Sequence, residues 1–296
     1  MMKLCRDAIR LTAFSLTSIA ACLVMSGCAG LGSPSTQPIL PDGRLLTQAG
    51  FIDMSTQDAL IRSYLKSPQS AAKENIDLTI YIEGDGAAWT MRQFAPSNPT
   101  PRYALGAQLA SQDSSSIVAY LGRPCQFLGP ITLERCDASL WTEGRFSPAA
   151  ISLGNQAIDA LLQRLSPHPI HKQQQIRLVG YSGGGAYAAL LASKRTDVSC
   201  LITIAAPLDI EVWSRLQQIA PLGASLNPAS PSQRLPKIDQ THWFGGKDHI
   251  VPPQSIGVFL TNNASPNTQV HVLPKANHLE PWSSQWAQLL QQSCGK

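Results

Sequence analysis

A serine set among glycines is the first feature of this sequence that could do chemistry. Residues 180–184 read Gly-Tyr-Ser-Gly-Gly, which places Ser182 in a G-x-S-x-G motif. Apolar residues 176–179 precede the motif, and an alanine-rich stretch of helical composition follows it. A serine between a strand and a helix sits on a sharp turn, where the helix N-terminus supplies N–H groups and positive potential. A phosphate-binding loop is the alternative, but no G-K-[ST] follows. Ser182 is the candidate nucleophile.

A serine hydroxyl becomes a nucleophile when a base takes its proton and an acid orients that base. With this type of turn, the chain order is serine, then an acid, then histidine. Asp248 follows the strand-like residues 243–244, and His278 lies in a loop after the strand-like residues 270–273. We expect His278 to be the base and Asp248 the acid. Asp209, at the end of another predicted strand, is the alternative acid.

The other histidines of the mature chain are weaker candidates. His249 adjoins the acid and would point away from the serine. His168 and His171 lie in a Pro-rich linker and are expected at the surface. His242 and His271 lie before or inside predicted strands and are expected to be structural.

Short apolar runs alternate with segments of helical composition along the chain. The runs expected to be strands are residues 58–65, 76–82, 116–121, 176–179, 201–205, 243–244 and 270–273. Helices are expected over residues 103–110, 149–165, 185–193, 210–219, 254–260 and 283–292. This alternation predicts an α/β fold with a mostly parallel sheet. Ligands of such sheets bind outside the carboxyl ends of the strands, where the three candidate residues are expected.

Acyl transfer also needs two donors that face the developing negative charge. The N–H of Gly183, directly after the nucleophile, is one candidate. The other is expected in the loop after residues 76–82, which reads Glu-Gly-Asp-Gly over residues 83–86.

Together these features resemble the α/β-hydrolase superfamily over roughly residues 50–294. Many members carry His-Gly-x in this loop, and the resemblance gives the second donor as the N–H of Asp85. Glu83 in place of histidine is a departure from that pattern. A subgroup of bacterial envelope hydrolases is similar in using Glu-Gly-Asp-Gly, together with a segment like Tyr-Leu-Gly-Arg-Pro-Cys-Gln at residues 120–126.

The resemblance implies an α/β-hydrolase fold over residues 48–296, with a mostly parallel central sheet and helices on both faces. It implies a serine hydrolase that cleaves a carboxylic ester or related acyl bond through an acyl-enzyme on Ser182, with no metal or cofactor. An acyltransferase or peptidase would use the same three residues. A non-catalytic envelope binding protein that keeps the fold is the alternative from another class.

Carboxylates at Glu83 and Asp85 would oppose a nearby oxyanion unless they are paired or turned away. Arg123 and Arg145 are the candidate partners, and a solvated Glu83 at the surface is the alternative. A glycosidase with two catalytic carboxylates would leave the serine motif unexplained.

The expected substrate pocket is less well defined by the sequence. Trp89, Trp141 and Phe146 could line it, although aromatic residues in loops are more often packing anchors. The Pro/Ser-rich residues 221–236 are expected to form a short cap loop. The absence of a long apolar insertion there favours small or soluble substrates.

The N-terminus has the pattern of a secretory signal over residues 1–27, with basic residues, a short apolar run and small residues at its end. Its end resembles a lipobox, Met25-Ser26-Gly27-Cys28, which implies lipidation of Cys28 and an outer-membrane protein facing the periplasm. An ordinary signal peptide with a stray cysteine is the alternative. Residues 28–47, rich in Gly, Ser, Pro and Thr, are expected to be a flexible tether.

Four cysteines remain in the predicted domain. Cys125 and Cys136 lie 11 positions apart in one loop and are the expected disulfide, which an oxidising compartment permits. A zinc site is the alternative, but C-x-x-C spacing is missing. Cys200 opens an apolar run and could be a buried thiol, and whether it pairs with Cys294 stays open.

The charge of the chain gives little reason to expect a nucleic-acid partner. The formal charge of +4 becomes +2 when the three basic residues and one acidic residue of the signal segment are removed. No basic run accompanies it. A small acyl substrate and a membrane, through the lipid anchor, are the expected partners.

Overall fold

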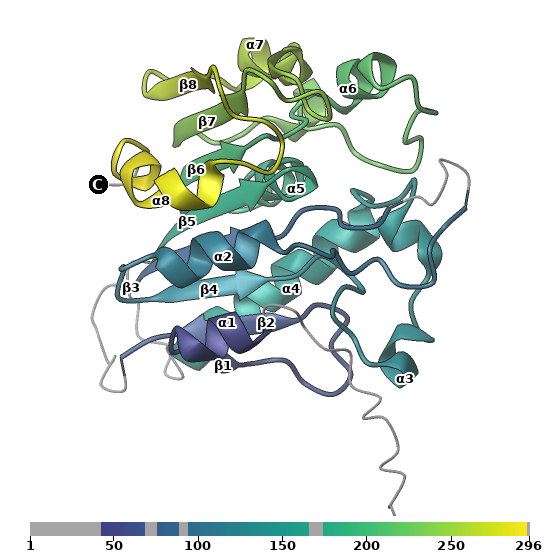
Figure 1. The fold of residues 1–296 in the computed structure, drawn as a ribbon, viewed down its shortest axis with the longest axis vertical. Coiled ribbons are helices and arrows are strands. Elements are labelled where there is room, and N and C mark those ends of the chain that lie inside the picture. Colours follow the sequence, from purple (N-terminus) through teal and green to yellow (C-terminus); the bar gives the residue numbers. More distant parts are fainter. Residues whose placement is uncertain (1–42, 69–75, 89–93, 166–173, 295–296) are drawn as a thin grey trace, which may run out of the picture. The chain divides into compact units, whose positions relative to one another are not determined.

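A mostly parallel sheet forms the centre of the protein in a computed structural model that describes residues 43–68, 76–88, 94–165 and 174–294 (Figure 1). Within these residues the sheet has eight strands in the order β1-β2-β4-β3-β5-β6-β7-β8. β1 and β2 are antiparallel to their neighbours, whereas β4, β3, β5, β6, β7 and β8 run parallel. The strands are β1 (Ile52–Asp53), β2 (Ser63–Lys66), β3 (Ile76–Ile82), β4 (Val118–Leu121), β5 (Gln174–Tyr181), β6 (Val198–Ile204), β7 (Asp239–Gly245) and β8 (Thr268–Leu273).

Helices cover both faces of this sheet, and α1, α2 and α8 lie in front of it in Figure 1. The helices are α1 (Gly43–Gln48), α2 (Leu105–Gln112), α3 (Pro130–Leu133), α4 (Pro148–Leu165), α5 (Gly183–Ala192), α6 (Ile210–Leu216), α7 (Phe259–Asn263) and α8 (Trp282–Gln291), with 3-10 turns at Ala138–Trp141, Pro231–Gln233 and Pro253–Ile256. The predicted α/β fold with a mostly parallel sheet and helices on both faces is confirmed.

The two faces are separate apolar cores because successive strand residues point to opposite sides. Ile80 and Ile82 pack with α4 and α5, whereas Tyr81 between them packs with α2 and α8. Every residue of α5 is buried. A helix that is apolar all round belongs in an interior, and α5 directly follows Ser182.

Two predicted segments differ from the structure. Residues 43–47 of the predicted tether belong to helix α1, in which Leu46 is fully buried and packs near Phe51. Composition suggested a tether, but the apolar side chain of Leu46 stabilises a docked helix. The strand predicted over residues 58–65 begins only at Ser63, because the residues before it form turns.

Two disulfides link the four cysteines of the described residues. Cys125 is bonded to Cys136, as predicted from their spacing. Cys200 is bonded to Cys294, so the interpretation of Cys200 as a buried thiol is wrong. That pair is separated by 94 residues and joins the start of β6 to the segment after α8.

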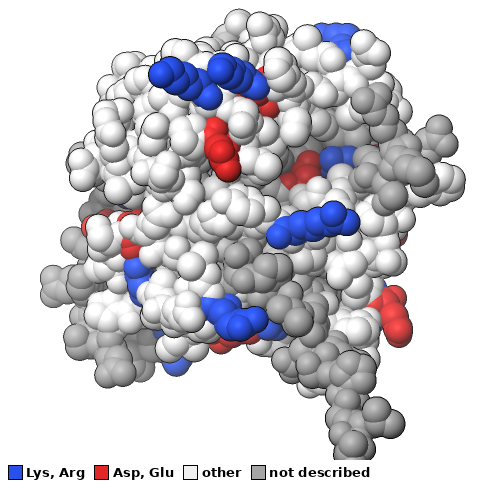
Figure 2. Space-filling view, viewed as in Figure 1, with Lys and Arg blue, Asp and Glu red and all other residues white. Residues whose placement is uncertain are grey.

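Charged side chains are scattered among uncharged ones on the face drawn in Figure 2. Lysine and arginine form no continuous stripe across that face. Among the residues that the structure describes, no helix combines the length and the apolar character needed to cross a bilayer.

Candidate active site

Ser182 lies on the sharp turn between β5 and α5. Its backbone has φ 53° and ψ −129°, a positive φ that is strained for a residue other than glycine. The Ser182 N–H donates to the carbonyl of Ile204 at 2.8 Å, which fixes the turn against β6. On its other side, the turn passes so close to the end of β3 that a Cβ at Gly184 would lie 2.3 Å from the Glu83 carbonyl oxygen. Only glycine at position 184 allows this approach.

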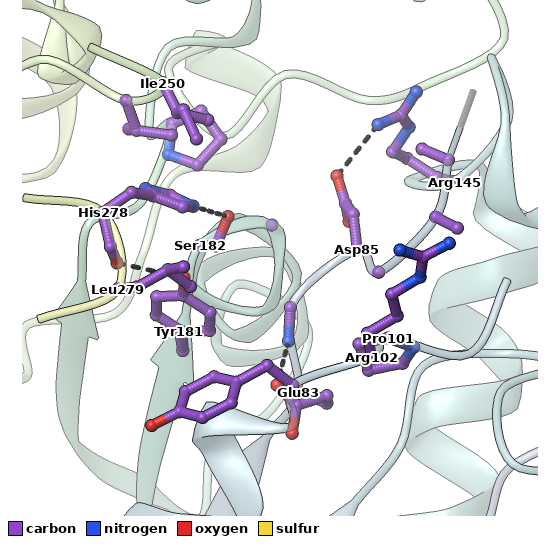
Figure 3. A pocket seen from close by; sticks show the side chains of 18 of the residues that line it. Glu83, Asp85, Pro101, Arg102, Arg145, Tyr181, Ser182, Ile250, His278 and Leu279 are labelled. Atoms are coloured by element: carbon purple, nitrogen blue, oxygen red, sulfur yellow. Dashed lines mark hydrogen bonds and ion pairs between the residues drawn. The ribbon is translucent and has the colours of Figure 1, made fainter. Parts of the chain in front are cut away.

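The structure brings Ser182, His278 and Asp248 together at the carboxyl ends of the strands (Figure 3). The Ser182 Oγ lies 3.0 Å from the Nε2 of His278. The Nδ1 of the same imidazole lies 2.8 Å from the Oδ2 of Asp248. Both distances are within hydrogen-bonding range, so the imidazole can accept the serine proton while the carboxylate holds its other nitrogen.

The carboxylate of Asp248 is fixed by backbone groups and is nearly inaccessible to solvent. Its Oδ1 accepts the N–H groups of Ile250 and Val251 at 2.8 Å each. The side chain has no exposed surface. Because one oxygen is held by the loop, the other faces the imidazole.

The His278 loop is held from two sides. The Tyr181 hydroxyl donates to the His278 carbonyl at 3.0 Å, and its ring lies 5.3 Å from the imidazole between centroids. The indole N–H of Trp282 also points to that carbonyl, at 3.1 Å. Tyr181 of β5 and Trp282 of α8 therefore hold the His278 backbone in position.

Asp209, the alternative acid, is engaged elsewhere. Its Oδ1 accepts the Val212 N–H and the Asn227 amide, and its Oδ2 accepts the Val258 N–H. It therefore caps α6, and its carboxylate is not the one bonded to His278.

The remaining histidines of the described residues have no contact with Ser182. His249 is exposed, and His271 stacks on Trp243 with 4.3 Å between ring centroids. His242 is fully buried in β7, where burial lowers its pKa to about 3 and keeps the ring neutral. His168 and His171 lie outside the described residues.

Glu83 is fully buried, so the alternative of a solvated glutamate is wrong. Its carboxylate accepts the N–H groups of Gly84, Gly106 and Ala107 and the hydroxyl of Tyr120, at 2.9–3.2 Å. Gly106 and Ala107 are the second and third residues of α2, so Glu83 ties the loop after β3 to that helix N-terminus. Burial raises the Glu83 pKa to about 7, and the four donors oppose that rise.

Asp85 takes both of the arginines that the sequence suggested as partners of the two carboxylates. Its Oδ1 lies 2.7 Å from Arg123 Nη1 and its Oδ2 lies 3.0 Å from Arg145 Nη1. Burial acts to raise the Asp85 pKa, but the charges of Arg145 and Arg123 outweigh it and lower the pKa below its ordinary value. One carboxylate and two guanidinium groups leave this cluster with a net positive charge.

The Asp85 carboxylate rests directly against the residue after the nucleophile. A Cβ at Gly183 would lie 2.0 Å from the Asp85 Oδ1, so position 183 has no room for a side chain. Neither the Gly183 N–H nor the Asp85 N–H donates a hydrogen bond to another group in the described part of the chain. Both residues line the cavity beside Ser182, which leaves these two amides available to a ligand oxygen.

That cavity has a volume of about 650 Å³ and opens between the strand ends and α6. Ser182 and His278 lie in its wall, and other residues around it are Arg102, Tyr103, Pro207, Trp213, Ile250 and Leu279. Its size lies in the range of cavities that bind small organic molecules. In Figure 3, the side chains of Ser182 and His278 point toward one another, and Asp85 points toward Arg145.

No family model matches the sequence, and no curated protein matches it. Among solved structures, an esterase from Pyrococcus furiosus is similar with a TM-score of 0.52 and 14% identity, over 84% of this chain and 94% of its own. A 2,6-dihydroxy-pseudo-oxynicotine hydrolase has a TM-score of 0.50 and 15% identity over 81% of this chain. The chain has the α/β-hydrolase fold. It spans 66% of the second protein's length, slightly less than two thirds.

The sequence did not identify several residues of the cavity wall, and two of the three aromatic residues considered for it are packing anchors, which was the more common outcome expected. Trp213 of α6 lines the cavity, but in the sequence it looks like any apolar helix residue. Trp141 is instead a packing anchor whose indole donates to the Pro96 carbonyl, and Phe146 is fully buried under the Arg123 guanidinium. Trp89 lies outside the described residues.

Proposed function

We propose that this protein is a serine hydrolase that cleaves a carboxylic ester or a related acyl bond. The proposal depends on one observation, the chain of contacts from Ser182 Oγ to His278 Nε2 and from His278 Nδ1 to Asp248. The fold alone would not support it, because one fold serves many activities.

In the proposed reaction, Ser182 Oγ attacks the acyl carbon and its proton passes to His278 Nε2. The carbonyl oxygen becomes an oxyanion and accepts hydrogen bonds from the N–H groups of Gly183 and Asp85. His278 then returns the proton to the leaving oxygen, and the C–O bond breaks to give an acyl-enzyme. A water molecule releases the acid by the same steps in reverse. Asp248 orients the imidazole and stabilises its protonated form.

The positive cluster of Asp85, Arg123 and Arg145 supports the same chemistry. It lies beside Gly183, where negative charge would develop on the substrate oxygen. The arginines neutralise the Asp85 carboxylate, which would otherwise raise the energy of an oxyanion nearby.

A fluorophosphonate probe tests this function directly. The wild type is expected to be labelled once, Ser182→Ala not at all, and Asp248→Asn about 10⁴-fold more slowly by comparison with known serine triads. Ser193→Ala, at the other end of α5, is the matched control and should label as the wild type does. Equal labelling of the wild type and Ser182→Ala would contradict the proposal.

We further propose that the protein is a lipid-anchored protein of the bacterial envelope, with Cys28 as the lipidated residue. Residues 1–42 lie outside the described residues, so the proposal depends on the sequence pattern of the N-terminus. The two disulfides support an oxidising compartment. Metabolic labelling with radioactive palmitate should mark the wild type and not Cys28→Ser, and labelling of both would contradict it.

A further inference from the structure

A second cavity of about 620 Å³ adjoins the cavity at Ser182. The two cavities have wall residues in common, so the second lies directly beside the first. The two cavities are of similar volume. The residues that line both are Gly86, Ala87, Ala88, Arg145 and Trp213.

One wall of the second cavity is mostly apolar and held in place. It consists of Trp213 and of the chain after α6, where Ile219, Ala220, Pro221 and Leu222 contribute carbon surface. The polar residue of this segment, Gln217, donates its side-chain amide to the His249 carbonyl at 2.8 Å. The indole N–H of Trp213 donates to the Ile250 carbonyl at 2.8 Å. This bond ties the wall to the loop that contains Asp248, so the cavity has a fixed position relative to the catalytic residues.

A second part of the lining contains two charges of opposite sign, Glu143 and Arg145. The Arg145 guanidinium is engaged by Asp85, and Glu143 is exposed. The Ser225 hydroxyl donates to the Glu143 carbonyl, and the Phe146 N–H donates to that hydroxyl at 3.1 Å, so the two parts of the lining are connected. Because Arg145 is already paired with Asp85 and Glu143 is exposed to solvent, neither charge offers a strong site for a charged ligand.

We propose that the second cavity binds an uncharged, apolar arm of the ester substrate, with Trp213 at the junction of the two cavities. The inference rests on the proposed function of Ser182 and deepens it, because it names the class of substrate. Esters whose arm is long enough to reach past Trp213 are the preferred substrates, in place of the small soluble esters expected from the sequence.

Ala220→Trp tests the inference, since Ala220 is exposed, small and lines only the second cavity. Ala264→Trp is the matched control, because Ala264 is also exposed and lines neither cavity. The kcat/KM is measured for p-nitrophenyl esters from acetate to dodecanoate and for acetates of alcohols of increasing length. One series identifies an acyl arm and the other an alcohol arm.

For the wild type and Ala264→Trp, kcat/KM should rise by up to about fourfold for each methylene buried, in one of the two series. For Ala220→Trp, acetate should be hydrolysed within twofold of the wild type, while the longest ester loses at least tenfold. A wild type without length dependence, or an Ala220→Trp variant with equal losses at all lengths, would overturn the inference.

Binding of the same esters to Ser182→Ala by calorimetry separates this inference from the proposed function. If binding to Ser182→Ala tightens with ester length, the added Ala220→Trp change abolishes this dependence, and the wild type hydrolyses no ester, then the hydrolase function is overturned and the second cavity is retained as a ligand site. If the wild type hydrolyses esters but binding does not depend on their length, then the second-cavity inference is overturned and the hydrolase function is retained.

Discussion

Replacing Glu83 with glutamine should change how stability depends on pH. The Glu83 carboxyl has a pKa of about 7 in the folded protein against 4.5 ordinarily, because burial outweighs its four donors. A group whose pKa is raised on folding contributes its full stabilisation at a pH below its pKa in the unfolded chain. This contribution is lost as the pH rises through its pKa in the folded protein. The wild type should therefore lose stability between about pH 4.5 and pH 7, and Glu83→Gln should lack this loss.

The size of the effect follows from the two pKa values. Their difference corresponds to on the order of 3 kcal/mol in the free energy of unfolding, and about 2.5 kcal/mol of this falls between pH 5 and pH 8. Glu83→Gln lowers stability at every pH, because the glutamine NH₂ faces backbone donors in the same buried site. The pH dependence of the difference between the two proteins isolates the titration of Glu83.

Urea unfolding of both proteins at pH 5, 6, 7 and 8 measures this difference. Neutral His242 contributes equally to both proteins and cancels. The advantage of the wild type over Glu83→Gln should shrink as pH rises. Parallel curves, or an advantage that grows with pH, would refute the reasoning, because the four donors would then outweigh burial and hold the carboxylate charged.

Two further changes test the packing of the Asp85 loop beside the nucleophile and the disulfide between Cys200 and Cys294. Gly183→Ala places a methyl group against the Asp85 carboxylate and should lower kcat at least about 100-fold, because it displaces an oxyanion donor. The control Gly223→Ala should keep the wild-type kcat, because nothing lies within 4 Å of its added Cβ. Equal kcat values for the two variants would contradict this. Cys200→Ala opens a 94-residue loop and should lower the free energy of unfolding by up to about 4–5 kcal/mol in non-reducing urea titrations, and an unchanged midpoint would contradict it.

The sequence was informative where a functional residue follows directly from its place on a strand. Ser182, Asp248 and His278 each stand just after a predicted strand, and parallel strands bring such positions to one edge of a sheet. The pairing of Cys125 with Cys136 was predictable for a similar reason, because both lie in one short loop.

What the sequence left open depends on packing between distant segments. It could not assign the two arginines, because Glu83 turns toward the N-terminus of α2 while only Asp85 faces Arg123 and Arg145. The bond between Cys200 and Cys294 likewise requires α8 to lie across the sheet. Trp213 lines the cavity because α6 packs on the loop after β7, and the sequence does not show that packing.

The longer disulfide also divides the catalytic residues between parts of the chain. Ser182 lies before Cys200, whereas Asp248 and His278 both lie within the ring of chain that the bond to Cys294 closes. A single protease cut in this ring, for instance between the exposed Gly223 and Ala224, would therefore produce two polypeptides that remain covalently joined. Such a nicked molecule would keep its imidazole and carboxylate tethered to the hydroxyl for as long as the sulfurs stay oxidised.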